Sequence, residues 1–246
     1  MRRRVSGILV PSREVSPSAP SIGSLSVVSP TTFSYAGFNW AGVYKSASSA
    51  YALQRSGNVW RAEVRSGDWA DVDNPNNPGQ ERAELDHVGT LLQPNVTNIT
   101  YLQMIPTGDA ITLPTGSIVG QLHHYADAGD ASSPPPLAIY VGAGDTLWVK
   151  IRYYTVKPMV SNPPSILIPI GRFQRNRWYS WRWRYRYDPT STGFLQVFRD
   201  EVPLVSYQGP FGFVNLLGPT PQFGIYRANS PEILIVYYAN IAIAYE

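Results

Sequence analysis

Short runs in which apolar and polar residues alternate recur along most of the chain from about Phe33 onward. Side chains two positions apart on an extended strand point to the same side, so this alternation predicts strands with one buried face. The expected strands are residues 59–65, 98–105, 117–123, 137–141, 146–154, 178–187, 194–198, 222–226 and 233–245. Between them, residues 73–79, 132–136 and 188–193 are rich in Asp, Asn, Ser, Pro or Gly and predict loops.

These features predict the fold class. No long segment has helical spacing, and no repeat of fixed period is present. The chain has 246 residues with 22 Pro, 20 Gly and 13% aromatic residues, which suits one large all-β domain. We therefore expect an all-β fold: a two-sheet antiparallel β-sandwich of the jelly-roll, concanavalin-like type.

Residues 1–35 differ from the rest, because they are rich in Ser, Pro and Val without sustained periodicity. We expect an extended N-terminal arm or linker there, and a jelly-roll domain over residues 36–246. The arm is expected to pack on a second copy of the chain or on a larger assembly such as a virion. Three arginines open the chain, but the apolar run after them is too short for a Sec export signal.

Composition limits the partners. The net charge of +3 is too small to predict nucleic-acid binding, and no apolar run is long enough for a membrane helix. The chain has no cysteine, and its three histidines lack metal-ligand spacing, so no metal or other cofactor is expected. Of these histidines, His124 is expected to point away from any surface site, and His87 to lie on the surface.

Three short motifs carry candidate chemistry: Arg82-Ala83-Glu84-Leu85, Gln121-Leu122-His123 and Gly224-Ile225-Tyr226. Alternation places Gln121 beside His123 on one strand face, and Arg82 beside Glu84 on another. Taken alone, these pairs also fit a solvated sheet face and a structural ion pair, so both interpretations stay open.

In order and strand context, the three motifs resemble the R-x-E-L, Q-x-H and K-x-G-x-Y elements of the jelly-roll polysaccharide lyases. This group includes heparin lyase I-like enzymes, glucuronan lyases and many alginate lyases. Residues 60–68 are similar to the strand and turn before R-x-E-L in the heparin lyase I-like branch. Residues 178–187 and 194–200 are similar to a later hairpin of that branch. The resemblance covers about residues 55–246.

The resemblance implies β-elimination on an anionic, uronic-acid-containing polysaccharide. Such an enzyme must neutralise the substrate carboxylate, remove the C5 proton and protonate the leaving oxygen. By matching, Gln121 and Arg82 would hold the carboxylate, His123 would be the base, and Tyr226 would be base or acid. Two further residues, Glu84 and Arg227, are expected to contact the substrate.

The sequence departs from the family pattern at two positions. Asp86 stands where an arginine often follows R-x-E-L, and Gln222 stands where a lysine usually opens the last motif. Both changes remove a cation from the site. They argue against a highly sulfated substrate.

Residues 181–187 alternate strictly between aromatic residues and arginine. We favour a core-facing aromatic row with Arg182, Arg184 and Arg186 in solvent. The alternative is that these arginines bind the polyanion as additional substrate contacts.

Two functional hypotheses follow. The first is a polysaccharide lyase that acts outside the cell, in one form as a depolymerase carried on a virion. The second is a non-catalytic virion structural or decoration protein that has kept a lyase-like jelly roll. We expect the protein to act outside the cell or on a virion. Otherwise, because it has no recognised Sec signal, it is expected in the cytoplasm.

Overall fold

The computed structural model describes residues 18–28, 32–44, 49–68, 79–93 and 95–246. In these ranges the strands are β1 (Ser26–Val27), β2 (Phe33–Tyr35), β3 (Phe38–Tyr44), β4 (Leu53–Ser56), β5 (Val59–Val64), β6 (Gln80–His87), β7 (Val96–Met104), β8 (Ser117–His123), β9 (Leu137–Gly142), β10 (Thr146–Tyr154), β11 (Ser165–Arg172), β12 (Tyr179–Arg186), β13 (Phe194–Arg199), β14 (Val202–Gln208), β15 (Gly212–Phe213), β16 (Thr220–Ala228) and β17 (Leu234–Tyr245). A short 3-10 helix, η2 (Ala143–Asp145), joins β9 to β10. None of the described residues forms a helix long and apolar enough to cross a membrane.

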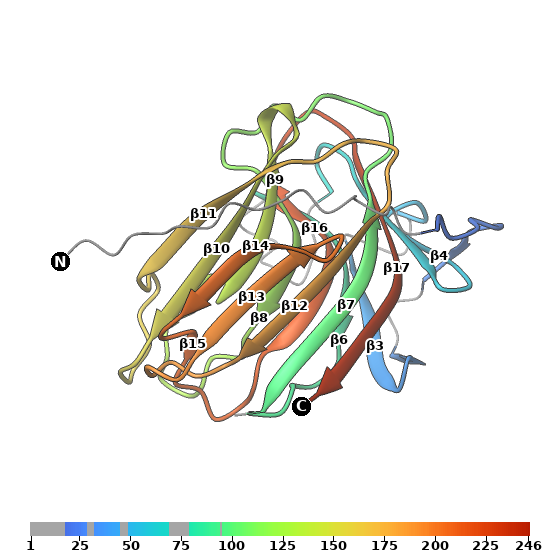
Figure 1. Ribbon diagram of the computed structural model, residues 1–246. Coiled ribbons are helices and arrows are strands. Elements are labelled where there is room, and N and C mark those ends of the chain that lie inside the picture. Colours follow the sequence, from blue (N-terminus) through green and yellow to red (C-terminus); the bar gives the residue numbers. More distant parts are fainter. Residues whose placement is uncertain (1–17, 29–31, 45–48, 69–78, 94) are drawn as a thin grey trace.

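The strands form two sheets that pack face to face (Figure 1). One sheet has eight strands in the order β1-β4-β5-β17-β7-β12-β13-β14. The other has nine, in the order β11-β10-β9-β8-β16-β6-β3-β2, with β15 pairing to β10. The strands along both orders pair antiparallel, and β15 runs parallel to β10. The predicted all-β sandwich is confirmed.

Large aromatic side chains fill the space between the sheets. Trp181, Trp183 and Tyr185 of β12 are at most 1% exposed and belong to the main core cluster. Trp183 stacks on Phe223 of the opposite sheet, with ring centroids 5.8 Å apart. The alternating segment therefore buries its aromatic face, as the favoured interpretation predicts.

Two edge strands, β11 and β14, were not predicted from the alternation because each contains a proline. Pro169 lies in β11 and Pro203 in β14, and both strands sit at the end of their sheet. In both cases the ladder register shifts at the proline. Proline has no N–H for the ladder, so it fits an edge strand or a bulge and masks the alternation.

The predicted boundary at residue 36 falls inside a hairpin. Strand β2 pairs with β3, and Phe33 stacks on Trp60 of the other sheet with centroids 5.4 Å apart. Strand β1 pairs with β4, and Val28 is buried in the core. The last part of the predicted arm thus belongs to the sandwich. Residues 1–17 of the arm lie outside the described residues, and its packing on a partner stays a prediction.

Candidate active site

The outer face of the nine-stranded sheet gathers the polar motif residues. On its central strands, Ala83, Leu122 and Ile225 point into the core. Because adjacent residues on a strand point to opposite faces, Arg82, Gln121 and the residues two positions from them point outward. Figure 1 shows the strands that carry this face side by side, from β11 through β10, β9 and β8 to β16 and β6.

Directly paired residues form two rows across this face. The first, the tyrosine row, runs over five strands through Arg82, Tyr226, Ile118, Tyr140 and Trp148. Each is the ladder partner of the next, so neighbouring side chains in the row stand about 5 Å apart at their bases.

The second, the glutamine row, runs parallel to the first. It passes through Asp86, Gln222, Gln121, Ala138 and Lys150 in the same way. Residues from four sequence-distant segments thereby meet on one surface.

Bulges set the distance between the two rows. The ladder shifts between Ile118 and Gly120 on β8, and between Gln222 and Tyr226 on β16. Gly224 sits inside the second shift with a φ of 152°, and a Cβ there would overlap the Ala83 carbonyl oxygen. Only glycine fits this backbone, which explains the glycine of the last motif.

The opposite sheet supports these bulges with hydrogen bonds through the core. The buried hydroxyl of Tyr238 on β17 donates to the Val119 carbonyl at 2.6 Å and lies 2.9 Å from the Gly224 carbonyl. Gln103 Nε2 on β7 also donates to the Val119 carbonyl, at 2.9 Å. Carbonyls that the irregular ladder leaves inside the sandwich are thus satisfied.

A hydrogen-bonded network joins the first two motifs around one carboxylate. Gln121 Nε2 donates to Glu84 Oε1 at 2.7 Å, and Arg82 Nε donates to Glu84 Oε2 at 2.6 Å. Gln222 Oε1 accepts from both donors, at 2.8 Å from Gln121 and 3.2 Å from Arg82. The Glu84 side chain is fully buried, so it orients Arg82 and Gln121 and does not face the surface. Its predicted contact with substrate is not supported.

The network also balances charge. Glu84 compensates Arg82, and Gln222 Nε2 donates to Asp86 Oδ1 at 2.9 Å. Burial is the main cause that raises the pKa of Asp86 from 3.8 to about 6, and the nearby Glu84 raises it further. The Gln222 hydrogen bond and Arg82 oppose this shift. At neutral pH this part of the site therefore has no excess positive charge.

Tyr226 lies between the network and a pocket. The Arg82 guanidinium is 5.6 Å from the centre of its ring, and the ring lines a pocket of about 540 Å³. The other lining side chains come mainly from the central and edge strands of the sheet and include Ile118, Tyr140, Trp148 and Lys150. Tyr226 is the predicted catalytic residue that the structure brings to this pocket.

His123 is on the same sheet at the other end of β8. It pairs with Thr220, whereas Tyr226 pairs with Ile118. At a rise of about 3.3 Å per residue, the two positions are on the order of 15 Å apart along the strand. His123 Nδ1 lies 2.7 Å from the His124 carbonyl oxygen, which can only accept, so Nδ1 carries the proton and the neutral ring has its lone pair on Nε2.

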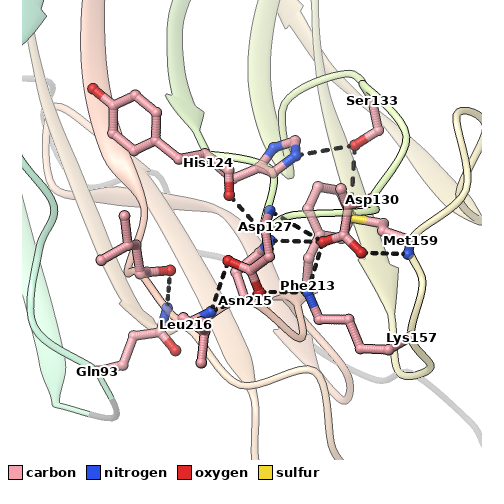
Figure 2. Close-up of polar contacts among 12 residues, drawn as sticks. Gln93, His124, Asp127, Asp130, Ser133, Lys157, Met159, Phe213, Asn215 and Leu216 are labelled. Atoms are coloured by element: carbon pink, nitrogen blue, oxygen red, sulfur yellow. Dashed lines mark hydrogen bonds and ion pairs between the residues drawn. The ribbon is translucent and has the colours of Figure 1, made fainter.

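His124 belongs to a group of loop contacts beside His123 (Figure 2). Its ring is buried against Phe213, and its Nε2 lies 3.2 Å from Ser133 Oγ. Burial is the main cause that lowers the pKa of His124 to about 4, with His123 adding to the effect. The His124 ring is buried as predicted, but it lies parallel to the His123 ring with centroids 5.3 Å apart, so its predicted orientation away from the site is not confirmed.

The same figure shows how the loops near His123 are tied together. Lys157 Nζ donates to Asp127 at 2.5 Å and to Asp130 at 2.6 Å. The Leu216 N–H donates to Asp127 at 3.0 Å, and the Met159 N–H donates to Asp130 at 2.8 Å. Three loops therefore meet at two carboxylates and fix the end of β8.

The prediction for His87 is wrong. His87 is only 5% exposed, and its ring packs edge-on against Phe38 and Trp40. Burial lowers its pKa, and Nδ1 contacts the Gly89 carbonyl at 3.2 Å. Within the described ranges, no three His, Asp or Glu side chains gather as candidate metal ligands.

Arg227 borders the pocket, but its side chain turns into the sandwich. Its side chain is fully buried, and it donates to Glu81 at 2.6 Å and to the Glu232 carbonyl at 2.6 Å. On β16 it alternates with Tyr226 and therefore shares the core-facing side with Ile225. Its predicted substrate contact is not supported.

The arginines of β12 lie on the outer face of the other sheet. Arg182 pairs with Glu201 at 3.1 Å, and Arg184 pairs with Glu246 at 2.6 Å. The guanidinium of Arg186 is 5.9 Å from the Phe194 ring centre. Since the sandwich separates them from Tyr226, they cannot join the same substrate contact, and the favoured solvent-facing interpretation holds.

Three residues that line the pocket were not predicted from the sequence: Tyr140, Trp148 and Lys150. The signal was present, because Trp148 and Lys150 alternate with buried residues on the predicted strand 146–154. What the sequence alone could not supply was the ladder register that brings β9 and β10 level with Tyr226.

Comparison with known proteins agrees with this geometry. The sequence profile of the polysaccharide lyases matches residues 31–242. The chain belongs to the polysaccharide lyase family. No curated protein sequence matches it. The family match starts close to β2, which agrees with the place of that strand in the sandwich.

Solved structures with the same fold are lyases as well. The endo-β-1,4-glucuronan lyase of the fungus Trichoderma reesei superimposes with a TM-score of 0.65 at 10% identity, over 91% of this chain and 95% of that one. Alginate lyase A1-II′, of polysaccharide lyase family 7, gives 0.57 at 14% identity, over 84% and 94%. An alginate lyase of Pseudomonas aeruginosa gives 0.52 at 14% identity, over 79% and 86%. At these identities the likeness shows a shared fold.

Proposed function

We propose that the protein cleaves a uronic-acid-containing polysaccharide by β-elimination. The observation that carries this proposal is the meeting of Arg82, Gln121 and Tyr226, from three sequence-distant motifs, on one sheet face beside a pocket. Membership of the polysaccharide lyase family supports the reaction class. The glucuronan and alginate lyases of the same fold support a uronate as the sugar.

In the reaction, a base removes the proton at C5 of the uronate. The electron pair of that C–H bond forms the C4–C5 double bond, the C4–O4 bond breaks, and the leaving oxygen receives a proton. Negative charge builds up on the substrate carboxylate as the C5 proton leaves. Arg82 is suited to binding this carboxylate because Glu84 holds its guanidinium in one orientation. Both amide hydrogens of Gln121 are donated to Glu84 and Gln222, so its predicted contact with the carboxylate requires one of these hydrogen bonds to be exchanged.

Tyr226 is the group that we expect to transfer protons. It borders the pocket, and the Arg82 guanidinium lies 5.6 Å from the centre of its ring. After taking the C5 proton, the same hydroxyl can donate it to the leaving oxygen. His123 stays a prediction for the base, and it would act only if the bound polysaccharide brings C5 to its end of β8.

The test is a screen of polyglucuronate, alginate and heparin for the ultraviolet absorbance of the unsaturated product. We expect product from a non-sulfated uronate. Tyr226→Phe should lower its rate about 10²–10⁴-fold while binding is kept, because proton transfer is a transition-state task. Arg182→Gln, on the opposite sheet, is the matched surface control and should keep the wild-type rate.

Two results would count against this proposal. One is a folded wild-type protein that releases no unsaturated product from any uronate glycan. The other is a Tyr226→Phe variant with the wild-type rate. A His123→Ala variant that keeps the full rate would remove His123 from the mechanism and leave both proton transfers to Tyr226.

A further inference from the structure

The substrate face lacks a cation at the position where the family pattern has a lysine. Gln222 occupies it, and Arg82 is already compensated by Glu84. Asp86 adds negative charge beside them. A site for an anionic polymer therefore needs positive charge from elsewhere.

Lys150 supplies a cation in the adjoining pocket. It lies in the glutamine row, two strands from Gln121, and its side chain lines the pocket that Tyr226 borders. Within the described part of the chain, no carboxylate lies at ion-pairing distance from its ammonium group, and burial and Arg152 lower its pKa. Two strand spacings are about 10 Å, so the long Lys150 side chain is within reach of a sugar bound beside the network.

Beside Lys150, the tyrosine row provides a stacked pair of aromatic rings. The rings of Tyr140 and Trp148 lie nearly parallel, with an interplanar angle of 8° and centroids 5.6 Å apart. Two glycines leave room for the Trp148 indole, since a Cβ on Gly116 would come within 2.6 Å of it and a Cβ on Gly142 would overlap it. Trp148 is half-buried, so its position is fixed while part of the ring stays accessible.

We propose that Lys150, Trp148 and Tyr140 form a uronate-binding subsite next to Tyr226. Lys150 binds the carboxylate of a sugar neighbouring the scissile bond, and the aromatic rings contact the apolar face of the sugar. This inference rests on the proposed function for its ligand class. It makes Lys150 a residue that favours an acidic sugar over a neutral one at this subsite.

The test measures binding in a Tyr226→Phe background, so that the ligand is not consumed. The probes are short β-1,4-linked oligosaccharides of glucuronate and of mannuronate, each with its neutral glucose or mannose counterpart. Lys150→Gln should weaken uronate binding about tenfold or more and leave the weak binding of the neutral counterparts unchanged. Lys150→Arg should retain most of the affinity, and Arg182→Gln is the matched control that removes a cation from the opposite sheet.

A separate variant tests the aromatic side of the subsite. Trp148→Phe keeps an aromatic ring in the glycine-lined seat and should weaken uronate and neutral sugars alike, by about 2- to 10-fold. The fluorescence change on uronate binding should also shrink, because Trp148 is the indole at the pocket. In the catalytically intact protein, Lys150→Gln should raise KM and leave kcat nearly unchanged.

The outcomes separate the subsite from the activity. If product forms and Tyr226→Phe abolishes it, yet Lys150→Gln binds uronates as its parent does, the subsite is wrong and the activity stands. If no glycan is cleaved, yet Lys150→Gln still weakens uronate binding selectively, the activity is wrong and the subsite stands. A parent protein that binds no uronate would overturn both.

Discussion

Both outer faces of the sandwich carry arginines at outward-facing strand positions, but the carboxylates that pair with these arginines differ between the two faces. On the eight-stranded sheet, Arg182 pairs with Glu201, whose side chain is 75% exposed. On the nine-stranded sheet, Arg82 pairs with Glu84, which is fully buried and also holds Gln121. Exposed pairs add little to stability, whereas breaking a buried pair leaves a charge without its partner.

This contrast teaches that alternation places a charged side chain on a face without giving that face a function. The Arg row of β12 has the denser positive charge, yet each arginine faces solvent and a local partner. On the nine-stranded sheet, bulges and a glycine bring Arg82 and Tyr226 together beside a pocket that Lys150 lines. Four predictions test this difference.

The largest effect is expected for Gly224→Ala, which attacks the bulge. The added methyl would overlap the Ala83 carbonyl oxygen, and the φ of 152° disfavours alanine. We expect the free energy of unfolding in urea to fall by about 3 kcal/mol or more. Gly171→Ala is the matched control, because its φ is 94° but no atom crowds the new Cβ, and about 1 kcal/mol is expected there. Equal losses would show that steric overlap at Gly224 does not matter.

Next is Tyr238→Phe, which removes the support that the bulges receive from the opposite sheet. The Val119 carbonyl would keep Gln103 as a donor, but it would lose the hydroxyl that it shares with Gly224. We expect a loss of about 1–3 kcal/mol in unfolding free energy. Tyr185→Phe on β12 should cost less, since within the described residues the Tyr185 hydroxyl contacts no such carbonyl. The reverse order would refute the role of Tyr238 at the bulge.

A third prediction concerns Asp86 and pH. Because its pKa is raised from 3.8 to about 6 in the folded protein, the folded state binds a proton that the unfolded state releases. Its charge therefore costs stability above about pH 6, and the cost disappears as the pH falls toward 4. Asp86→Asn should be about 1–2 kcal/mol more stable than wild type near pH 8, with a smaller difference near pH 5.

Glu246 on the other face is the control for this pH dependence. Its hydrogen bond with Arg184 lowers its pKa to about 2, so its contribution is present above the unfolded value and lost only toward acid. The difference between Glu246→Gln and wild type should stay nearly constant from about pH 8 to about pH 5. An Asp86→Asn difference that is equally constant would contradict the raised pKa.

The smallest effect is expected for Arg182→Gln. Its ion pair with Glu201 is exposed, so the unfolding free energy should change by less than about 0.5 kcal/mol. Calorimetric titration with a uronate oligosaccharide should give the wild-type affinity. A loss comparable to that of Lys150→Gln would restore the alternative in which the β12 arginines bind the polyanion.

Much of the fold could be predicted from alternation alone. The expected strands 117–123 and 146–154 coincide with β8 and β10, because both have a continuous buried face. Strands β11 and β14 were missed because proline interrupts their pattern. His87 was misplaced because the strand that buries it, β3, was not among the expected ones.

The site was harder to predict from the sequence than the fold was. The pairing of Arg82 with Glu84 could be read from their spacing, since residues two apart share a strand face. The contact of Glu84 with Gln121 depends on β16 lying between β6 and β8, which no local pattern encodes. The bulges also shift the register, so a uniform ladder would have placed Lys150 wrongly relative to Tyr226.

The length of the tyrosine row can be compared with the length of a bound polysaccharide. From Arg82 on β6 to Trp148 on β10 it crosses four strand spacings, a length of about 19 Å. One strand spacing is comparable to the length of one pyranose unit, so a polymer lying along the row would meet a new strand at nearly every sugar. The number of strands between Tyr226 and the edge of the sheet would then set how many sugars are held on that side of the broken bond. Lengthening the row on that side would require a further strand, because β11 is the edge of the sheet.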